Sequence, residues 1–258
     1  IGTKQDYAKA YKIFTESKKH NIPLTYRYLA EMYTNGWGVE KSTEKAVENY
    51  MIAAKGKDIE AEYQIALVYI KSIDQNPKNP KEALRWLEIS SEHGHAKAQY
   101  KLGMLYWKGL IVKKNYDKAF SWFSKSARSG LAESEFMIGR SYYEGKSVSQ
   151  DKPRAARWFK LAAEKEHPLA LTMLGQMYKW GDGVRQSDVE AFKYFRKAAM
   201  TGNAEAQYNL GRMYFKGMAG LSPNSFEAAK WWQKAARQGH DMAITKLNKL
   251  DIIISNTD

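Results

Sequence analysis

Histidine is the residue type in this chain best suited to bind a metal ion or to move protons near neutral pH. The five histidines are His20, His93, His95, His167 and His240. None is four residues from another, the spacing that places two histidines on one helix face for zinc. His95 and His240 each follow a glycine at matching places in a repeated motif. We therefore predict structural or solvated histidines and no metal site.

The other residues that commonly carry out catalysis show no convergent arrangement. The chain has no cysteine, which excludes disulfides, thiolate zinc sites and cysteine nucleophiles. No Ser–His–Asp set stands out from the repeated motifs. The pieces GWGV (36–39) and GDGV (181–184) could suggest phosphate binding, but a nucleotide loop follows a strand, whereas these pieces follow helical patterns. We predict plain loops there, no cofactor and no enzymatic activity.

The chain's motifs recur at a nearly constant period. AQYKLGMLYWKG at 98–109 returns as AQYNLGRMYFKG at 206–217, which is 108 residues later. A second motif, seen in KAFSWF and RAARWF, repeats with the same period. One slot of the first motif recurs every 36 or 37 residues, at Ala30, Ala66, Gly103, Gly139, Gly175 and Gly211. Such a period is typical of a solenoid built from stacked supersecondary units.

Each repeat contains two helical patterns. Ala98, Leu102 and Tyr106 lie on one face of the first helix, and Ala119 and Phe123 on one face of the second. Glycine inside a helix costs about 1 kcal/mol relative to alanine, so its recurrence in the first helix predicts close packing of two helices. Glycines that recur just after the helices predict left-handed C-terminal caps.

The predicted fold is an all-α solenoid of about six helix-turn-helix repeats, each of 36–37 residues, with a lone helix at either end. We expect a single domain over residues 1–258, with flanking helices at 5–20 and 243–251. The repeats are expected at 25–60, 61–97, 98–133, 134–169, 170–205 and 206–242. SIDQNPKNPKEA (72–83) and MAGLSPNSFEA (218–228) lie in the two longer repeats, and we expect bulging loops in both.

The unit L-G-x-x-Y followed by A-x-x-x-F overlaps the tetratricopeptide pattern. The 36-residue period, the G-x-G-V loop, the KAxxWFxKAA element and the GHAKA piece (94–98) together resemble the Sel1-like repeat (SLR) family. The resemblance covers nearly the whole chain. It implies a right-handed α-α superhelix that serves as an adaptor or scaffold for other proteins. It also implies an extracytoplasmic location in a bacterium, in host interaction, wall-enzyme regulation or immunity, and it brings no shared catalytic residues.

The charge of the chain is strongly basic. Lysine and arginine number 41 against 28 acidic residues, a net charge of +13. This balance favours acidic proteins, polyanions or anionic surfaces as partners. No run of 18 apolar residues is present, so we predict no transmembrane segment. The chain begins at Ile1 without a charged-then-apolar leader, and we interpret it as a cropped or processed product.

The exposed surface of the first helix of each repeat is the candidate binding surface. By alignment with the tetratricopeptide unit, its concave positions are those three before and one, four and five after the repeated glycine. These 24 positions hold seven basic and two acidic residues. Aromatic anchors are expected at slots that vary between repeats: Trp107, Tyr143, Trp180 and Phe215. Cations expected to pair with acidic partner residues are Lys108, Arg140, Arg212 and Lys216.

Three functions fit these features. The leading hypothesis is an adaptor that binds a partner protein with an acidic surface or segment in its concave groove. A second is an immunity or regulatory protein that inhibits a partner enzyme or toxin. A third is an RNA-binding helical repeat, although basic residues are interspersed with acidic ones, and Glu31 and Glu144 line the proposed groove. The aromatic anchors could instead pack against the next repeat.

Overall fold

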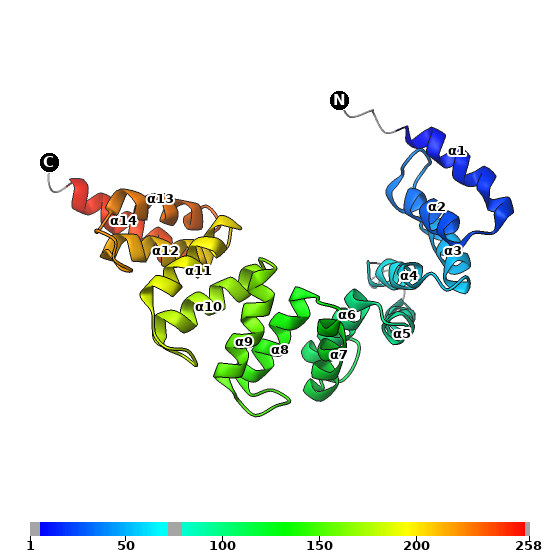
Figure 1. Cartoon of the computed structure of the whole chain (residues 1–258). Helices are drawn as coiled ribbons and strands as arrows, with labels where there is room; N and C mark the ends of the chain where they lie inside the picture. The colour runs from blue at the N-terminus through cyan, green and yellow to red at the C-terminus, as the bar shows by residue number, and fades with distance from the viewer. Residues whose placement is uncertain (1–5, 72–78, 256–258) are drawn as a thin grey trace. The chain divides into compact units, whose positions relative to one another are not determined.

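The computed structural model describes residues 6–71 and 79–255. This part of the chain consists of helices and connecting turns, without any strand (Figure 1). The chain divides into two compact units, residues 1–129 and 130–258, and each is described by itself. The all-α solenoid class predicted from the repeats is confirmed by the helix pairs within each unit. The expectation of one domain over residues 1–258 stays a prediction.

In the first unit, three helix pairs follow a lone helix and a short 3-10 turn, Lys18–His20 (Figure 1). Its helices are α1 (Tyr7–Ser17), α2 (Pro23–Asn35), α3 (Thr43–Lys55), α4 (Ile59–Lys71), α5 (Asn79–Glu92), α6 (Ala96–Lys108) and α7 (Tyr116–Arg128). The partners α2–α3, α4–α5 and α6–α7 pack along their lengths, and each pair contacts the next through α3–α4 and α5–α6.

The second unit repeats the same arrangement and ends in a lone helix (Figure 1). Its helices are α8 (Ala132–Glu144), α9 (Lys152–Glu164), α10 (Pro168–Trp180), α11 (Asp188–Met200), α12 (Ala204–Lys216), α13 (Ser225–Ala236) and α14 (Asp241–Ser255). The pairs are α8–α9, α10–α11 and α12–α13, and α14 packs on α13. Residues 218–224 form the longer turn expected before α13, whereas most of the other expected loop, residues 72–78, lies outside the described residues.

The helix boundaries follow from capping side chains. A helix leaves its first backbone N–H groups without internal partners, and a side-chain acceptor just before it satisfies one of them. The caps of the second helices are Ser42, Asn115, Asp151, Ser187 and Asn224, and each accepts a hydrogen bond from a backbone N–H three residues later. The glycine caps predicted at the C-termini of the first helices are confirmed. Gly181 after α10 and Gly217 after α12, among others, have left-handed backbone.

The glycine inside four of the first helices, α6, α8, α10 and α12, marks the closest approach of two helices. A Cβ atom on Gly175 would lie 2.6 Å from Phe195 Cδ1 on α11. Gly103, Gly139 and Gly211 meet the rings of Phe123, Phe159 and Trp232 in the same way, and these aromatic side chains are fully buried. The predicted packing role of the recurring glycine is thereby confirmed.

The two G-x-G pieces are loops, as predicted, and their second glycine has a packing role. Gly183 has a φ of +72°, and a Cβ atom there would lie 2.6 Å from the backbone carbon of Lys152. Gly38 approaches the backbone of Tyr7 still more closely. Only glycine permits both the left-handed backbone and this contact. The loop therefore binds the N-terminal end of the preceding repeat's second helix.

Candidate functional site

Three of the four predicted aromatic anchors share one packing role. The slot four residues after the repeated glycine directs its ring onto the second helix of the same pair. The ring centroid of Trp107 lies 6.1 Å from that of Phe123, the Tyr143 centroid 6.4 Å from Phe159, and the Phe215 centroid 5.5 Å from Trp232. This slot therefore packs within its own repeat, rather than against the next repeat as the alternative interpretation held.

The exposure of these rings differs between repeats. Trp107 is 7% exposed and also packs edge-on against Tyr116 at 4.9 Å, so it offers little surface to a partner. Tyr143 is half-buried and its hydroxyl donates a hydrogen bond to Asp182 at 2.8 Å. Burial and this hydrogen bond raise the pKa of Tyr143 to about 12. Trp107 and Tyr143 thus stabilise the packing within their own units.

Trp180 and Phe215 are the predicted anchors that remain open. Trp180 lies one position beyond the packing slot and is 67% exposed, and Phe215 is 38% exposed. Phe215 also lines a small, mostly apolar hollow of about 130 Å³ together with Trp232 and Leu250. Engineered apolar cavities of roughly 150 Å³ bind benzene, so the hollow is large enough for one apolar side chain. Lys246 and Lys249 stand at its edge.

Of the four predicted cations, one forms an ion pair with a residue of the chain and three form none among the described residues. Arg140 forms an ion pair with Glu144, which also contacts Lys146. Lys108 is exposed at the end of α6 in the first unit. In the second unit, Arg212 and Lys216 lie on α12, and the ring of Tyr208 is 5.7 Å from the Arg212 guanidinium. Neither Arg212 nor Lys216 forms an ion pair within the described part of the chain.

A third cation, Lys179, was not among the predicted site residues. It occupies the packing slot of α10, where other repeats place a ring, and it is only 8% exposed. Its Nζ donates one hydrogen bond, 3.3 Å long, to Asn209 Oδ1 on α12. Burial and the nearby charges of Arg212 and Lys216 lower the pKa of Lys179. The structure therefore brings these three cations together.

The same face of the first unit contains charged groups that are paired with one another. Arg27 forms ion pairs with both Glu31 and Asp58, at 3.1 Å and 3.0 Å. Glu62 is buried and contacts His93 at 2.8 Å. Arg27 and His93 therefore have acidic partners on the chain itself, whereas Lys108 forms no ion pair among the described residues. The surface formed by Trp180, Arg212, Phe215 and Lys216, which we call the α10–α12 face, differs because it combines cations without ion pairs and two exposed aromatic rings.

His95, His167 and His240 have a structural role, which is one of the two roles predicted for the histidines. Each of the three caps the N-terminus of a first helix, with Nδ1 accepting a backbone N–H three residues later. Each ring also stacks on an aromatic ring of the preceding repeat, at 4.4 to 4.8 Å between centroids. In two of them, Nε2 contacts a glutamate: Glu60 for His95 and Glu205 for His240.

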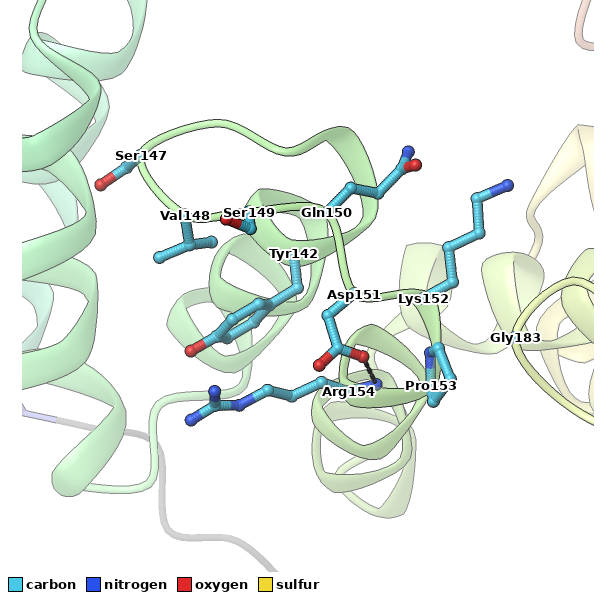
Figure 2. A pocket seen from close by; sticks show the side chains of 10 residues that line it. All are labelled: Tyr142, Ser147, Val148, Ser149, Gln150, Asp151, Lys152, Pro153, Arg154 and Gly183. Carbon is cyan, nitrogen blue, oxygen red and sulfur yellow. Dashed lines mark hydrogen bonds between the residues drawn. The ribbon is translucent and has the colours of Figure 1, made fainter.

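A hollow of the second unit lies beside the loop between α8 and α9 (Figure 2). Its volume is about 910 Å³. The Arg154 guanidinium lies 4.5 Å from the centre of the Tyr142 ring, Asp151 caps α9 by accepting from the Arg154 backbone N–H, and Lys152 forms an ion pair with Asp182. These charged groups are engaged in holding the loop. The hollow has no paired nucleophile and base among its lining residues.

Among the described residues, no three histidine, aspartate or glutamate side chains gather closely enough to hold a metal ion. No helix in the described segments has the length and apolar character needed to cross a membrane.

Comparison with known proteins identifies the repeat. The family model for the Sel1 repeat matches seven segments: 1–21, 23–58, 59–95, 96–131, 132–167, 168–203 and 204–240. The first of these segments contains the lone helix α1. The matches therefore cover nearly the whole chain, as the resemblance predicted.

Two solved structures share the fold. A Sel1 repeat protein from Oxalobacter formigenes is 30% identical, with a TM-score of 0.83 over 96% of this chain and 71% of that protein. The protein c5321, a protective antigen of uropathogenic Escherichia coli with an SLR fold, is 26% identical, with a TM-score of 0.86 over 93% of this chain and 51% of its own.

A curated relative matches over a shorter stretch. Chitin synthase regulatory factor 3 of Schizosaccharomyces pombe is 28% identical over 109 residues, which are 41% of this chain and 12% of that protein. The chain thus spans a small part of this relative and about half of c5321. Sel1 repeat proteins generally mediate protein–protein interactions and are typically non-enzymatic, and the chain belongs to the Sel1 repeat family.

Proposed function

We propose that this protein is an adaptor that binds a partner protein on the α10–α12 face of its second unit. The observation that carries the proposal is the combination, on one face, of exposed aromatic side chains with cations that form no ion pair among the described residues. Trp180 and Phe215 are exposed, and Arg212 and Lys216 flank them without forming ion pairs among the described residues. Aromatic residues and arginine are the side chains most enriched at the energetic centres of protein interfaces.

The solvent exposure of each side chain on this face indicates which contact it would make with the partner. The partner would bury Trp180, which is the more exposed ring, and fill the hollow beside Phe215 with an apolar side chain. Arg212 and Lys216 would attract acidic residues of the partner and fix its register. Of the other predicted contacts, Tyr143 and Arg140 are held by Asp182 and Glu144, so their contribution would be smaller.

The test is retention of proteins on the immobilised chain, after nuclease treatment, at about 0.15 M and 0.5 M salt. The variant Trp180→Ala/Phe215→Ala removes both open rings. The matched control is Phe226→Ala on α13, which removes a ring that is 70% exposed on a second helix. We expect a partner that native chain and control retain at both salts, and that the double variant loses. Removing interface anchors of this kind costs about 2–4 kcal/mol of binding free energy.

The salt series also separates protein from nucleic acid. Binding to a polynucleotide depends on the release of counterions and falls steeply with salt. In samples without nuclease, retention of nucleic acid at low salt alone, with no protein retained at either salt, would contradict the adaptor proposal. Equal retention of a protein by native chain and double variant would place the interface outside the α10–α12 face.

A further inference from the structure

We infer that Lys179 is an anion-binding residue, and that the α10–α12 face takes a carboxylate of an acidic partner segment at this buried ammonium group. The inference rests on the proposed function and names the chemistry of the partner. It begins from the place of Lys179 in the repeat. At the equivalent slot, Trp107, Tyr143 and Phe215 pack rings against the second helix of their pair, whereas α10 has a lysine that is 8% exposed.

The buried ammonium group of Lys179 has fewer partners among the described residues than its charge and its three donors call for. Lysine has three N–H donors, and burial of a charge is costly unless it is paired. Nζ of Lys179 makes a single hydrogen bond, with Asn209 Oδ1 at 3.3 Å. Within the described segments, no carboxylate forms an ion pair with it. Glu205, an acidic group that attracts Lys179, is already held by Asn209 and His240.

The surroundings make the deficit of negative charge larger. Arg212 and Lys216 repel Lys179 from α12, while Glu205 and Asp188 attract it without contact. Positive charge thus accumulates on one small surface of the unit. A structural lysine would be expected to have an acidic partner, as Arg27 has in Asp58 and Glu31. A lysine that binds an anionic ligand has no acidic partner in the free protein, because the ligand supplies the negative charge.

The neighbouring ring indicates a protein segment rather than a free ion. Nζ of Lys179 lies 4.9 Å from the centre of the Trp180 ring, and that ring is 67% exposed. A carboxylate that reached Lys179 would therefore bring its own chain across Trp180. The hollow beside Phe215 on α12 would take an apolar side chain of the same segment. Charge complementarity and these apolar contacts together favour an acidic peptide with at least one apolar residue.

The experiment measures binding of a synthetic peptide by calorimetry at about 0.15 M salt. The peptide has six glutamates around one leucine, and a second peptide has glutamines in place of the glutamates. Inorganic phosphate is the third probe. The variant is Lys179→Met, which keeps most of the length and apolar volume of the side chain. The control, Lys230→Met, removes a lysine whose side chain is 50% exposed and paired with Glu227 on α13.

We expect the acidic peptide to bind the native chain and the control, and Lys179→Met to weaken binding about 10- to 100-fold. The glutamine peptide should bind too weakly to measure to the native chain, to the Lys230→Met control and to Lys179→Met. Urea unfolding supplies a second readout. A lysine retained for ligand binding leaves a buried charge under-satisfied, so Lys179→Met should unfold at the same or a higher urea concentration. Strong destabilisation by this variant would show a structural lysine and overturn the inference.

The remaining outcomes also decide the question. Phosphate binding that equals peptide binding and is lost with Lys179→Met would identify a site for free inorganic anions, which contradicts a protein ligand. Equal peptide affinity for native chain and Lys179→Met, or no peptide binding at all, would also overturn the inference. If the Trp180→Ala/Phe215→Ala variant still lost its protein partner in either case, the adaptor proposal would stand without the carboxylate site.

Discussion

The glycine inside the first helices α6, α8, α10 and α12 gives the sharpest test of the packing. Gly175→Ala removes a helix-interior glycine, which by propensity alone should stabilise the protein by about 1 kcal/mol. The new Cβ atom would lie 2.6 Å and 2.7 Å from two carbons of the Phe195 ring, and 3.0 Å from a third. Phe195 is fully buried and has no space to retreat. Overpacking of this kind costs about 1–3 kcal/mol, so we expect a net destabilisation of about 1 kcal/mol.

The chain itself offers the matched control. Its second repeat has alanine at this slot, Ala66, and packs it in one buried cluster with Leu87 on the second helix. In a Phe195→Leu background, Gly175→Ala should therefore change sign and stabilise the protein, since the ring is gone. The difference between the two backgrounds is a coupling energy of the size that contacting residues show, roughly 0.5–3 kcal/mol.

Urea unfolding followed by circular dichroism measures all four variants. The dependence of the unfolding free energy on urea should be the same in each, so that shifts of the midpoint report stability. Gly175→Ala that stabilised the protein by about 1 kcal/mol in both backgrounds would refute the reasoning. That result would mean that the recurring glycine is not placed by the contact with the second helix.

Two further predictions concern pH. The hydrogen bond with His95 outweighs burial and lowers the pKa of Glu60 from 4.5 to about 2, so stability should be full above pH 4.5 and decline as the pH falls towards 2. Glu60→Gln should flatten this part of the profile in urea unfolding, and an unchanged slope would contradict it. Burial, against the attraction of Glu133, lowers the pKa of His167 below 6.5, so its stability contribution is present above pH 6.5 and lost as the pH falls below it. His167→Asn copies the cap Asn203, so it should unfold like the native chain at pH 7.5 and lose this pH dependence; marked destabilisation at pH 7.5 would argue against the capping role.

Much of the fold was predictable because it rests on local rules that repeat. The period placed the helix pairs, and the glycine slot indicated where two helices meet before its aromatic partner was known. The caps followed equally well where the sequence was regular. The N-terminal caps formed by histidines were not predicted from the sequence. At His167 the preceding residue is Glu166 rather than the glycine found before His95 and His240, and the backbone of Glu166 takes the same left-handed turn with a φ of +60°.

The candidate site was predictable only in part, because slot position does not fix exposure. The slot of Trp107 and Tyr143 turns its side chain towards the second helix of the same pair, and one residue further the chain points outward, as at Trp180. Lys179 counts among the seven basic concave positions, but the sequence does not show that its slot is buried. Its burial depends on α12 and Asn209, which belong to the next repeat. Information of that kind lies in the packing of repeats rather than in any one motif.

The most direct test of the account is site-specific crosslinking. A photoreactive phenylalanine derivative is placed at position 180 in one protein and at position 226 in another, since Trp180 and Phe226 are similarly exposed on a first and a second helix. Each protein is irradiated in an extract of its own cells. We expect a discrete protein adduct from position 180 that position 226 does not form. The same adducts from both positions, or an adduct from position 226 alone, would contradict the claim that the α10–α12 face binds the partner.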